Sequence, residues 1–255
     1  MAMIEFGGLF AGYEQKTILS DVSLCCPDGS VTAIVGPNGC GKSTLLKSVF
    51  SLAVVQKGNI LVDGLPLDAL SPRQLAQHAA YLPQSRNTPN ITAGRMVLHG
   101  RFPYLSYPRR YRPADLEEAR RAMARVSAEE LYDLPMTELS GGQRQRIYLA
   151  TALAQNTRNI LMDEPITYLD VAHQLSLMRL AKTLAAEGKS VIMVLHDLCL
   201  ALRYADRIAL LNAGRLLQTG TPEELYEGGR LAQTFGVSIG CVQSGSGRNY
   251  YIAEA

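Results

Sequence analysis

The residues most able to do chemistry lie at positions 36–43, which read GPNGCGKS and fit the complete phosphate-loop pattern. Glycines there let backbone N–H groups turn toward a phosphate, and a following helix adds its positive end. Lys42 can reach the β- and γ-phosphates, and the Ser43 hydroxyl can ligate Mg²⁺. The alternative is a glycine-rich turn that happens to precede a helix, and the apolar strand predicted at 31–35 argues against it. The predicted nucleotide contacts are Gly36, Asn38, Gly39, Cys40, Gly41, Lys42, Ser43 and Thr44.

Two carboxylates follow the apolar run 159–162, which is predicted to be a strand. We expect Asp163 to hold Mg²⁺ through water and Glu164 to polarise the attacking water. An Asp-Glu pair can also cap a helix or lie in a solvated turn. Its position favours the metal site, because Ser43 and Asp163 both follow carboxyl ends of predicted parallel strands, the edge where open α/β sheets bind ligands.

His196 follows another predicted strand, 190–195, at the same edge. By itself it is most simply an ordinary buried histidine. Its place near the phosphate loop instead indicates a contact to the γ-phosphate.

A second possible anion site lies at 139–143, which read LSGGQ and precede the basic, amphipathic start of a helix at 144–154. A serine and two glycines at a helix N-terminus let the backbone approach a phosphate closely. The same residues also serve as ordinary capping. On the first interpretation one chain carries two half-sites for anions, and the residues of the second are Ser140, Gly141, Gly142 and Gln143.

Alternating strands and helices must position these residues. Turn residues in 1–30 predict antiparallel strands, and after residue 156 the alternation of strand and helix predicts a parallel sheet. The remaining expected elements are strands at 58–64, 207–211 and 215–218 and helices at 74–79, 174–187 and 198–204. No element is assigned after Gly240.

Residues 86–156 differ from the rest because strand-like runs are scarce. Leu116, Ala119, Met123 and Val126 form an apolar stripe at helical spacing, and Glu117 is placed to pair with Arg121 one turn later. We expect a mainly helical insertion.

Bulk properties exclude several classes of protein. The 255 residues are 47% hydrophobic, and 25 basic against 23 acidic residues give no general reason to expect nucleic acid as a partner. No apolar run approaches the length that spans a bilayer, and the start of the chain does not resemble a secretory signal, which favours the cytoplasm. The five cysteines lack metal-ligand spacing and are interpreted as reduced thiols, with Cys25 and Cys26 on opposite faces of a strand and Cys40 as a small loop residue.

The order and spacing of these motifs resemble the ATP-hydrolysing subunit of an ABC transporter over residues 3–237. In that family the signature LSGGQ of one subunit closes over the ATP held by the phosphate loop of another. The resemblance implies ATP and Mg²⁺ as cofactors, a homodimer, membrane-embedded permease partners and no nucleic acid. By position, Gln84 is similar to a catalytic glutamine that contacts metal and water, and Asp170 is similar to a dimer-interface aspartate. Tyr13 is similar to an aromatic residue that stacks on adenine. Tyr13 also fits a turn residue that packs on the core.

The resemblance implies an α/β fold: a phosphate-loop NTPase core with a parallel sheet, an N-terminal antiparallel β subdomain and an inserted α-helical subdomain. We expect a single domain over 1–255, with the core in 1–85 and 157–240, the helical subdomain in 86–156 and a tail at 241–255. Ile166 departs from the family, which commonly has threonine there.

Three further stretches, 100–103, 165–174 and 196–198, are similar to the ATPases of iron-chelate, haem and cobalamin importers. Tyr104 stands where these relatives usually have histidine, and Ala93 and Gly94 interrupt a more apolar helix start. We expect the chain to lie at the cytoplasmic face of the inner membrane and to energise uptake of a ferric siderophore, with haem and cobalamin as alternatives. A substrate-binding protein is an indirect partner. The basic cluster at 109–112 is either a contact to permease or lipid or, more simply, a solvated loop.

Two other classes of protein share part of the pattern. A soluble ABC protein of translation or DNA repair usually carries two cassettes or a long coiled-coil insertion, neither of which is visible here. A phosphate-loop kinase or GTPase would have no use for 139–143.

Overall fold

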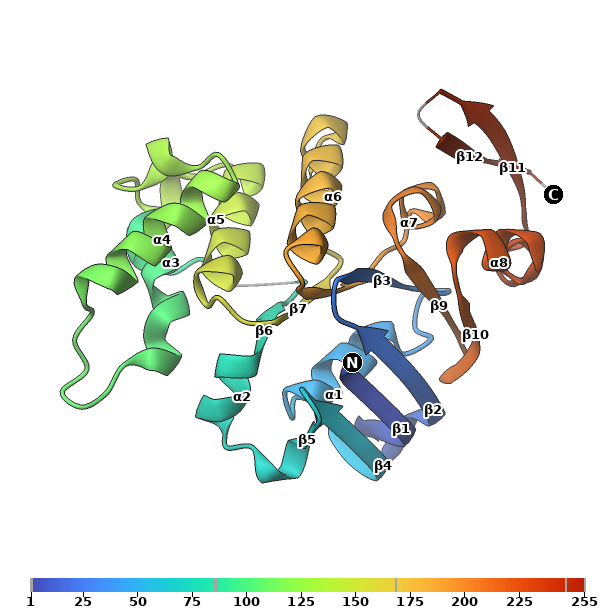
Figure 1. The fold of residues 1–255 in the computed structure, drawn as a ribbon, viewed down its shortest axis with the longest axis horizontal. Coiled ribbons are helices and arrows are strands. Elements are labelled where there is room, and N and C mark those ends of the chain that lie inside the picture. The colour runs from blue at the N-terminus through green and yellow to red at the C-terminus, as the bar shows by residue number, and fades with distance from the viewer. Residues whose placement is uncertain (1, 85–86, 168, 246, 255) are drawn as a thin grey trace.

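A six-stranded sheet forms the centre of this computed structural model, which describes residues 2–84, 87–167, 169–245 and 247–254. The strand order is β10-β9-β3-β8-β7-β6, and the five strands from β9 to β6 are parallel while β10 runs antiparallel to β9 (Figure 1). The strands are β3 (Ser30–Val35), β6 (Ala79–Leu82), β7 (Asn159–Asp163), β8 (Ser190–Val194), β9 (Arg207–Asn212) and β10 (Arg215–Gly220). Every residue of β3, β7 and β8 is buried, as expected for parallel strands covered on both faces.

Successive residues of these strands point to different hydrophobic clusters. Val31, Ala33 and Val35 pack with α6 (Val171–Ala186) and α7 (Leu198–Tyr204) on one face of the sheet. Ile34 packs on the other face with α1 (Lys42–Val49) and the N-terminal strands. The period-two alternation of a strand therefore gives the central sheet two separate cores.

The N-terminal residues form the predicted antiparallel sheet, in the order β2-β1-β4-β5. Its strands are β1 (Ala2–Tyr13), β2 (Lys16–Pro27), β4 (Val54–Val62) and β5 (Leu65–Pro66). Cys25 is exposed and Cys26 is buried, which confirms that they point to opposite faces, and all five cysteines are free thiols. The strand predicted at 58–64 begins earlier, at Val54.

The segment after β6 is helical, as predicted, and contains α3 (Ala93–Leu98), α4 (Pro113–Arg125) and α5 (Gly141–Ala154), with 3₁₀ turns at His99–Tyr104, Glu129–Leu131 and Met136–Glu138. The expected pair forms, with 3.0 Å between Arg121 Nη2 and Glu117 Oε1. Ala119, Met123 and Val126 of the apolar stripe are buried, whereas Leu116 is 37% exposed. In the first turn of α4 the interior position is taken by Asp115, whose carboxylate accepts a hydrogen bond from Arg101 Nε at 3.1 Å.

Gly94 and Tyr104, two departures noted in the sequence, have packing explanations. A Cβ on Gly94 would lie 2.6 Å from the ring of Tyr132, so glycine is required for this close approach. Tyr104 donates its hydroxyl to the carbonyl of Gln155 at 2.8 Å, and the guanidinium of Arg101 lies 4.1 Å from its ring centre.

The sequence pattern predicts no element after Gly240, whereas the structure has two strands at the C-terminus. They form a hairpin of β11 (Val237–Ser244) and β12 (Gly247–Glu254), which follows helices α8 (Pro222–Glu227) and α9 (Arg230–Phe235). Tyr250 anchors the hairpin by an edge contact with Tyr226, at 5.3 Å between ring centres. A short helix, α2 (Pro72–His78), precedes β6. In the described part of the chain no helix is long and apolar enough to cross a membrane.

Candidate functional site

The parallel register brings three separate loops to one edge of the sheet. Ile34 of β3 and Asp163 of β7 both pair with Val194 of β8, so the residues that follow these strands emerge side by side. The phosphate loop follows β3, Glu164 follows β7 and His196 follows β8. The predicted shared edge is therefore present.

The backbone of the phosphate loop has the shape of an anion cradle. Gly39 has a φ of 76°, and a Cβ built on it would meet no atom within 4 Å, so this part of the loop faces open space. Gly41 is the N-cap of α1 and has a φ of 106°. Because glycine has no side chain, the first amides of the helix receive no hydrogen bond from a capping side chain. These free N–H groups and the helix dipole fit a phosphate group.

Lys42 is 5% exposed, and its ammonium group lies inside the loop. Nζ donates to the carbonyl oxygens of Gly36 at 2.8 Å and Pro37 at 3.0 Å. The cation is thus held by backbone dipoles next to the cradle. Burial raises the pKa of the neighbouring Cys40 thiol, although Lys42 acts in the opposite direction, and a protonated thiol agrees with its interpretation as a small loop residue.

Asp163 lies at the end of β7 and is 1% exposed. Its carboxylate accepts hydrogen bonds from Ser43 Oγ at 2.8 Å and from the Tyr81 hydroxyl at 3.3 Å. Burial raises the pKa of Asp163, and these two hydrogen bonds oppose the increase. A buried carboxylate beside a hydroxyl is a pair of hard oxygen donors, which is the kind of group that would hold Mg²⁺.

Glu164 carries the most unusual backbone conformation of the site, with a φ of 50°. A positive φ in a non-glycine residue is unfavourable and often marks a functional position. Its two carboxylate oxygens have different partners, because Gln84 Nε2 donates to Oε2 at 2.6 Å and His196 Nε2 lies 2.6 Å from Oε1. Thr167 Oγ1 lies 3.5 Å from Oε2. The structure therefore brings the three residues predicted to be catalytic together.

The signature residues begin α5 in a capping box. Ser140 Oγ accepts from the Gln143 amide at 3.3 Å, and Gln143 Oε1 accepts from the Ser140 amide at 2.8 Å. Gly141 is exposed, and a Cβ on it would meet no atom within 4 Å. In Figure 1 α5 lies with the helical insertion, apart from α1, so one chain does not bring the signature to its own phosphate loop.

Among the described residues, neither Asp170 nor Tyr13 is seen to contact Asp163 or Glu164. Asp170 caps α6, and one of its oxygens accepts from both the His173 amide at 2.9 Å and His173 Nδ1 at 2.8 Å. These hydrogen bonds lower the pKa of Asp170. Tyr13 is exposed at the end of β1, and no contact to the phosphate loop is seen among the described residues.

Sequence reasoning missed two members of the site. Tyr81 donates to Asp163, and Thr167 approaches Glu164. Tyr81 could have been found from its position, because it lies in the strand that leads to Gln84 and therefore near the carboxyl edge of the sheet. Ile166, which replaces a threonine of the family, is 8% exposed and packs in the larger core cluster, so its side chain is structural.

A phosphate cradle, a buried carboxylate and a strained glutamate at one edge of a parallel sheet define a phosphate-loop nucleotide-binding protein. Residues 19–167 match the sequence profile of the family described as ABC transporter. The chain is 37% identical to the ferric enterobactin transport ATP-binding protein FepC of Escherichia coli (strain K12), over 90% of this chain and 85% of that protein. It is 38% identical to the hemin import ATP-binding protein HmuV of Rhodococcus jostii (strain RHA1), over 89% of this chain and 78% of that protein.

The fold is also similar to that of one chain in the solved structure of a metal-chelate type ABC transporter in an inward-facing conformation. That match has a TM-score of 0.84 at 24% identity and covers 99% of this chain and 97% of that chain. The chain belongs to the ABC transporter family. It is a nucleotide-binding ATPase subunit.

Proposed function

We propose that two copies of this chain hydrolyse MgATP to energise the import of an iron chelate across the inner membrane. The observation that carries the proposal is the separation of the two half-sites. Gly39 of the phosphate loop and Gly141 of the signature both face open space, and the two motifs lie in different parts of one chain. A head-to-tail pair of chains would place each signature over the other chain's phosphate loop, which completes two sites.

Within each site we assign separate tasks to the clustered side chains. Lys42 and the loop amides bind the phosphates, and Ser43, Asp163 and Gln84 would hold Mg²⁺. The ion would supply charge neutralisation on the phosphate oxygens. Glu164 would accept a proton from the attacking water.

The contacts of Glu164 support this role. Gln84 and His196 hold its two oxygens at 2.6 Å each, so the carboxylate has a defined orientation. We assign His196 an additional contact to the γ-phosphate. In the paired chain, Ser140, Gly141, Gly142 and Gln143 would bind the phosphate of the opposite nucleotide, Asp170 would contact the partner and Tyr13 would stack on adenine.

A groove beside the helical insertion supports docking to a permease. It has a volume of about 730 Å³ and is lined from α2 and from the segment after α3. Phe102 and Tyr107 are exposed there, Tyr107 by 96%, and the guanidinium of Arg109 lies 4.8 Å from the Phe102 ring centre. An apolar groove with a cationic rim suits an apolar helix end near anionic headgroups. We propose that the chain docks here on the cytoplasmic face of the membrane.

We further propose that residues 1–255 act as one domain, in which 86–156 is a movable helical subdomain. Gln84 lies two residues before this segment and contacts Glu164, so movement of the segment would change the geometry of the carboxylate.

The cargo proposal rests on the names of the relatives, which transport ferric enterobactin and hemin. A ferric siderophore is our first choice, and haem and cobalamin are the alternatives. The ATPase subunit does not touch the cargo, which would reach the permease through a substrate-binding protein.

The test is to purify the chain with the membrane protein that co-isolates with it and to reconstitute both in liposomes. ATP hydrolysis is then measured with binding proteins loaded with ferric siderophore, haem or cobalamin. Stimulation by one loaded binding protein would support import and identify the cargo. Full ATPase activity without any membrane partner would instead indicate a soluble ABC protein.

A further inference from the structure

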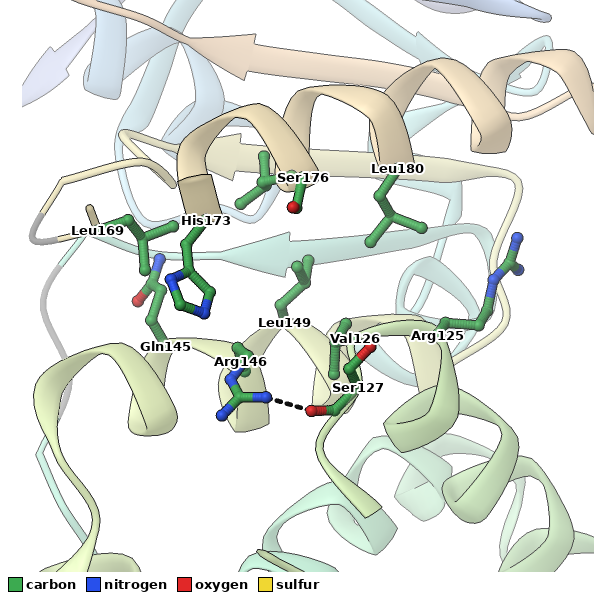
Figure 2. A pocket seen from close by; sticks show the side chains of 11 residues that line it. Arg125, Val126, Ser127, Gln145, Arg146, Leu149, Leu169, His173, Ser176 and Leu180 are labelled. Carbon is green, nitrogen blue, oxygen red and sulfur yellow. Dashed lines mark hydrogen bonds between the residues drawn. The ribbon is translucent and has the colours of Figure 1, made fainter. Parts of the chain in front are cut away.

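A pocket outside the proposed ATP site lies between the helical insertion and the core. Its volume is about 200 Å³, and it is lined by α5, by α6, by the end of α4 and by Leu169. Figure 2 shows His173, Ser176 and Leu180 reaching from α6 toward Leu149 and Arg146 of α5. None of the residues proposed for the nucleotide site lines this pocket, although Leu169 is the sequence neighbour of Asp170. The pocket is therefore a separate site.

The walls of the pocket are aliphatic. Leu149 and Leu177 are buried at its base, and Val126, Leu169 and Leu180 complete the apolar surface. Its volume is below the ~300–1,000 Å³ of sites that hold drug-sized ligands. An occupant is therefore a small molecule with an apolar body, such as one or two rings or a short acyl chain.

The polar part of the lining supplies donors and cations but no carboxylate among the described residues. Arg146 and His173 face each other at one end of the pocket, and Arg125 lies at the other (Figure 2). The carboxylates that pair with the arginines, Glu130 and Glu187, lie outside the lining.

Arg146 has unused hydrogen-bonding capacity. Its Nη1 donates to the carbonyl of Ser127, while Nε has no hydrogen-bond partner among the described residues. Nε itself is enclosed by protein atoms, and the guanidinium group of this lining residue is the cation that a carboxylate in the pocket would meet. His173 Nδ1 donates to Asp170, so that in the neutral ring Nε2 is an acceptor, and the group at this end of the lining that can bind a carboxylate is Arg146.

We propose that this pocket binds a small apolar acid, with its carboxylate at Arg146 and its apolar body between Leu149, Leu177 and Leu180. Occupancy alters ATP turnover, because the ligand bridges α5 and α6. α5 begins at the signature serine, and His173 holds Asp170 at the start of α6. The effect on turnover rests on the proposed ATPase function, whereas the binding itself does not.

Binding is tested by isothermal titration calorimetry of the full-length, nucleotide-free chain with 2-naphthoate. The uncharged amide of the same shape, 2-naphthamide, is the matched ligand. We expect saturable binding of one naphthoate per chain and roughly ten-fold weaker binding of the amide, since a charged hydrogen bond is lost. No saturable binding of naphthoate, or equal binding of both compounds, would overturn the proposal.

Three variants locate the ligand. Ser176→Phe fills the pocket from α6, and we expect it to weaken naphthoate binding at least ~10-fold by steric exclusion. Thr183→Phe adds the same ring at an exposed position of α6 outside the lining, and it leaves binding and ATPase activity unchanged. Arg146→Met lowers the affinity for naphthoate and not for the amide, and thermal unfolding shows whether each variant is folded. Binding that neither Ser176→Phe nor Arg146→Met weakens would place the ligand elsewhere and refute the assignment.

The regulatory part is measured as ATP hydrolysis with increasing naphthoate. We expect a change of several-fold in wild type, with a midpoint equal to the calorimetric affinity, and an unchanged response in Thr183→Phe. Binding without any change in turnover would refute the coupling and leave the pocket in place. A chain without any ATPase activity would refute the proposed function, and the calorimetric result would still stand.

Discussion

Glu164 combines an unfavourable backbone with hydrogen bonds to both oxygens, and this combination makes its chemistry testable. Glu14 provides a control for the backbone conformation because it has the same φ of 50° and is exposed in a turn, outside the cluster of Gln84, Glu164 and His196. We expect Glu164→Gln to reduce ATP turnover by at least ~100-fold, because the amide cannot accept the proton of the attacking water. Nucleotide binding should persist.

Steady-state phosphate release measures turnover, and a fluorescent ATP analogue measures binding. Glu14→Gln should match wild type in both assays. Unchanged turnover in Glu164→Gln would remove the glutamate from the mechanism.

Asp163 gives a prediction about pH. Burial raises its pKa above the ordinary value of 3.8. A group with a raised folded-state pKa favours the folded chain at acid pH, and this contribution is lost as the pH rises through the folded-state pKa. We therefore expect Asp163→Asn to raise the free energy of unfolding of the nucleotide-free chain near neutral pH, with a gain that shrinks toward about pH 4.

Urea unfolding of both proteins across this pH range measures the effect. Asp170 should show the opposite sign, since hydrogen bonds from His173 lower its pKa and its contribution is lost as the pH falls. A constant difference between wild type and Asp163→Asn at all pH values would contradict the argument.

Most elements could be predicted because their apolar patterns are local. The buried runs of β3, β7 and β8 match the expected strands closely, and α6 begins three residues before its predicted start because Asp170 supplies the cap. The hairpin of β11 and β12 was missed because Gly240 and the polar turn interrupt its alternation. Contacts such as Gln84 with Glu164, which lie 80 positions apart, follow from sheet order rather than from any local pattern.

The C-terminal hairpin itself carries a prediction, because neighbouring residues of β12 point to opposite faces. Tyr250 is 9% exposed against Tyr226, whereas Tyr251 is 53% exposed. We expect Tyr250→Ala to lower the free energy of unfolding by about 2–3 kcal/mol, since it removes a buried ring and its aromatic contact. Tyr251→Ala should cost less than ~1 kcal/mol. Equal losses, measured by urea unfolding, would show that the hairpin does not pack as described.

The whole molecule predicts complementation between two inactive chains. Lys42→Ala removes the phosphate-loop cation, and Ser140→Arg blocks the signature, so each protein alone should lack ATPase activity. A mixed dimer would contain one intact site, formed by the phosphate loop of the Ser140→Arg chain and the signature of the Lys42→Ala chain. We expect mixing at equal concentration to restore about a quarter of wild-type activity if sites act independently and chains pair at random.

Ser71→Arg is the control for this experiment, because Ser71 forms the same kind of capping box at the start of α2. It should lose helix stability without losing ATPase activity. Absence of recovery in the mixture, with folded proteins of both kinds, would argue against a site shared between chains.

The edge strand β6 has a mechanical consequence. It pairs with β7 and, as the last strand in the sheet order, has no second described neighbour. The helix before it, α2, lines the groove proposed for the permease. Tyr81 of β6 and Gln84 after it donate hydrogen bonds to Asp163 and Glu164, respectively. A pull on α2 would therefore act on both hydrogen bonds at once, so that, on the proposed function, a partner bound in the groove would loosen Asp163 and Glu164 together rather than one after the other.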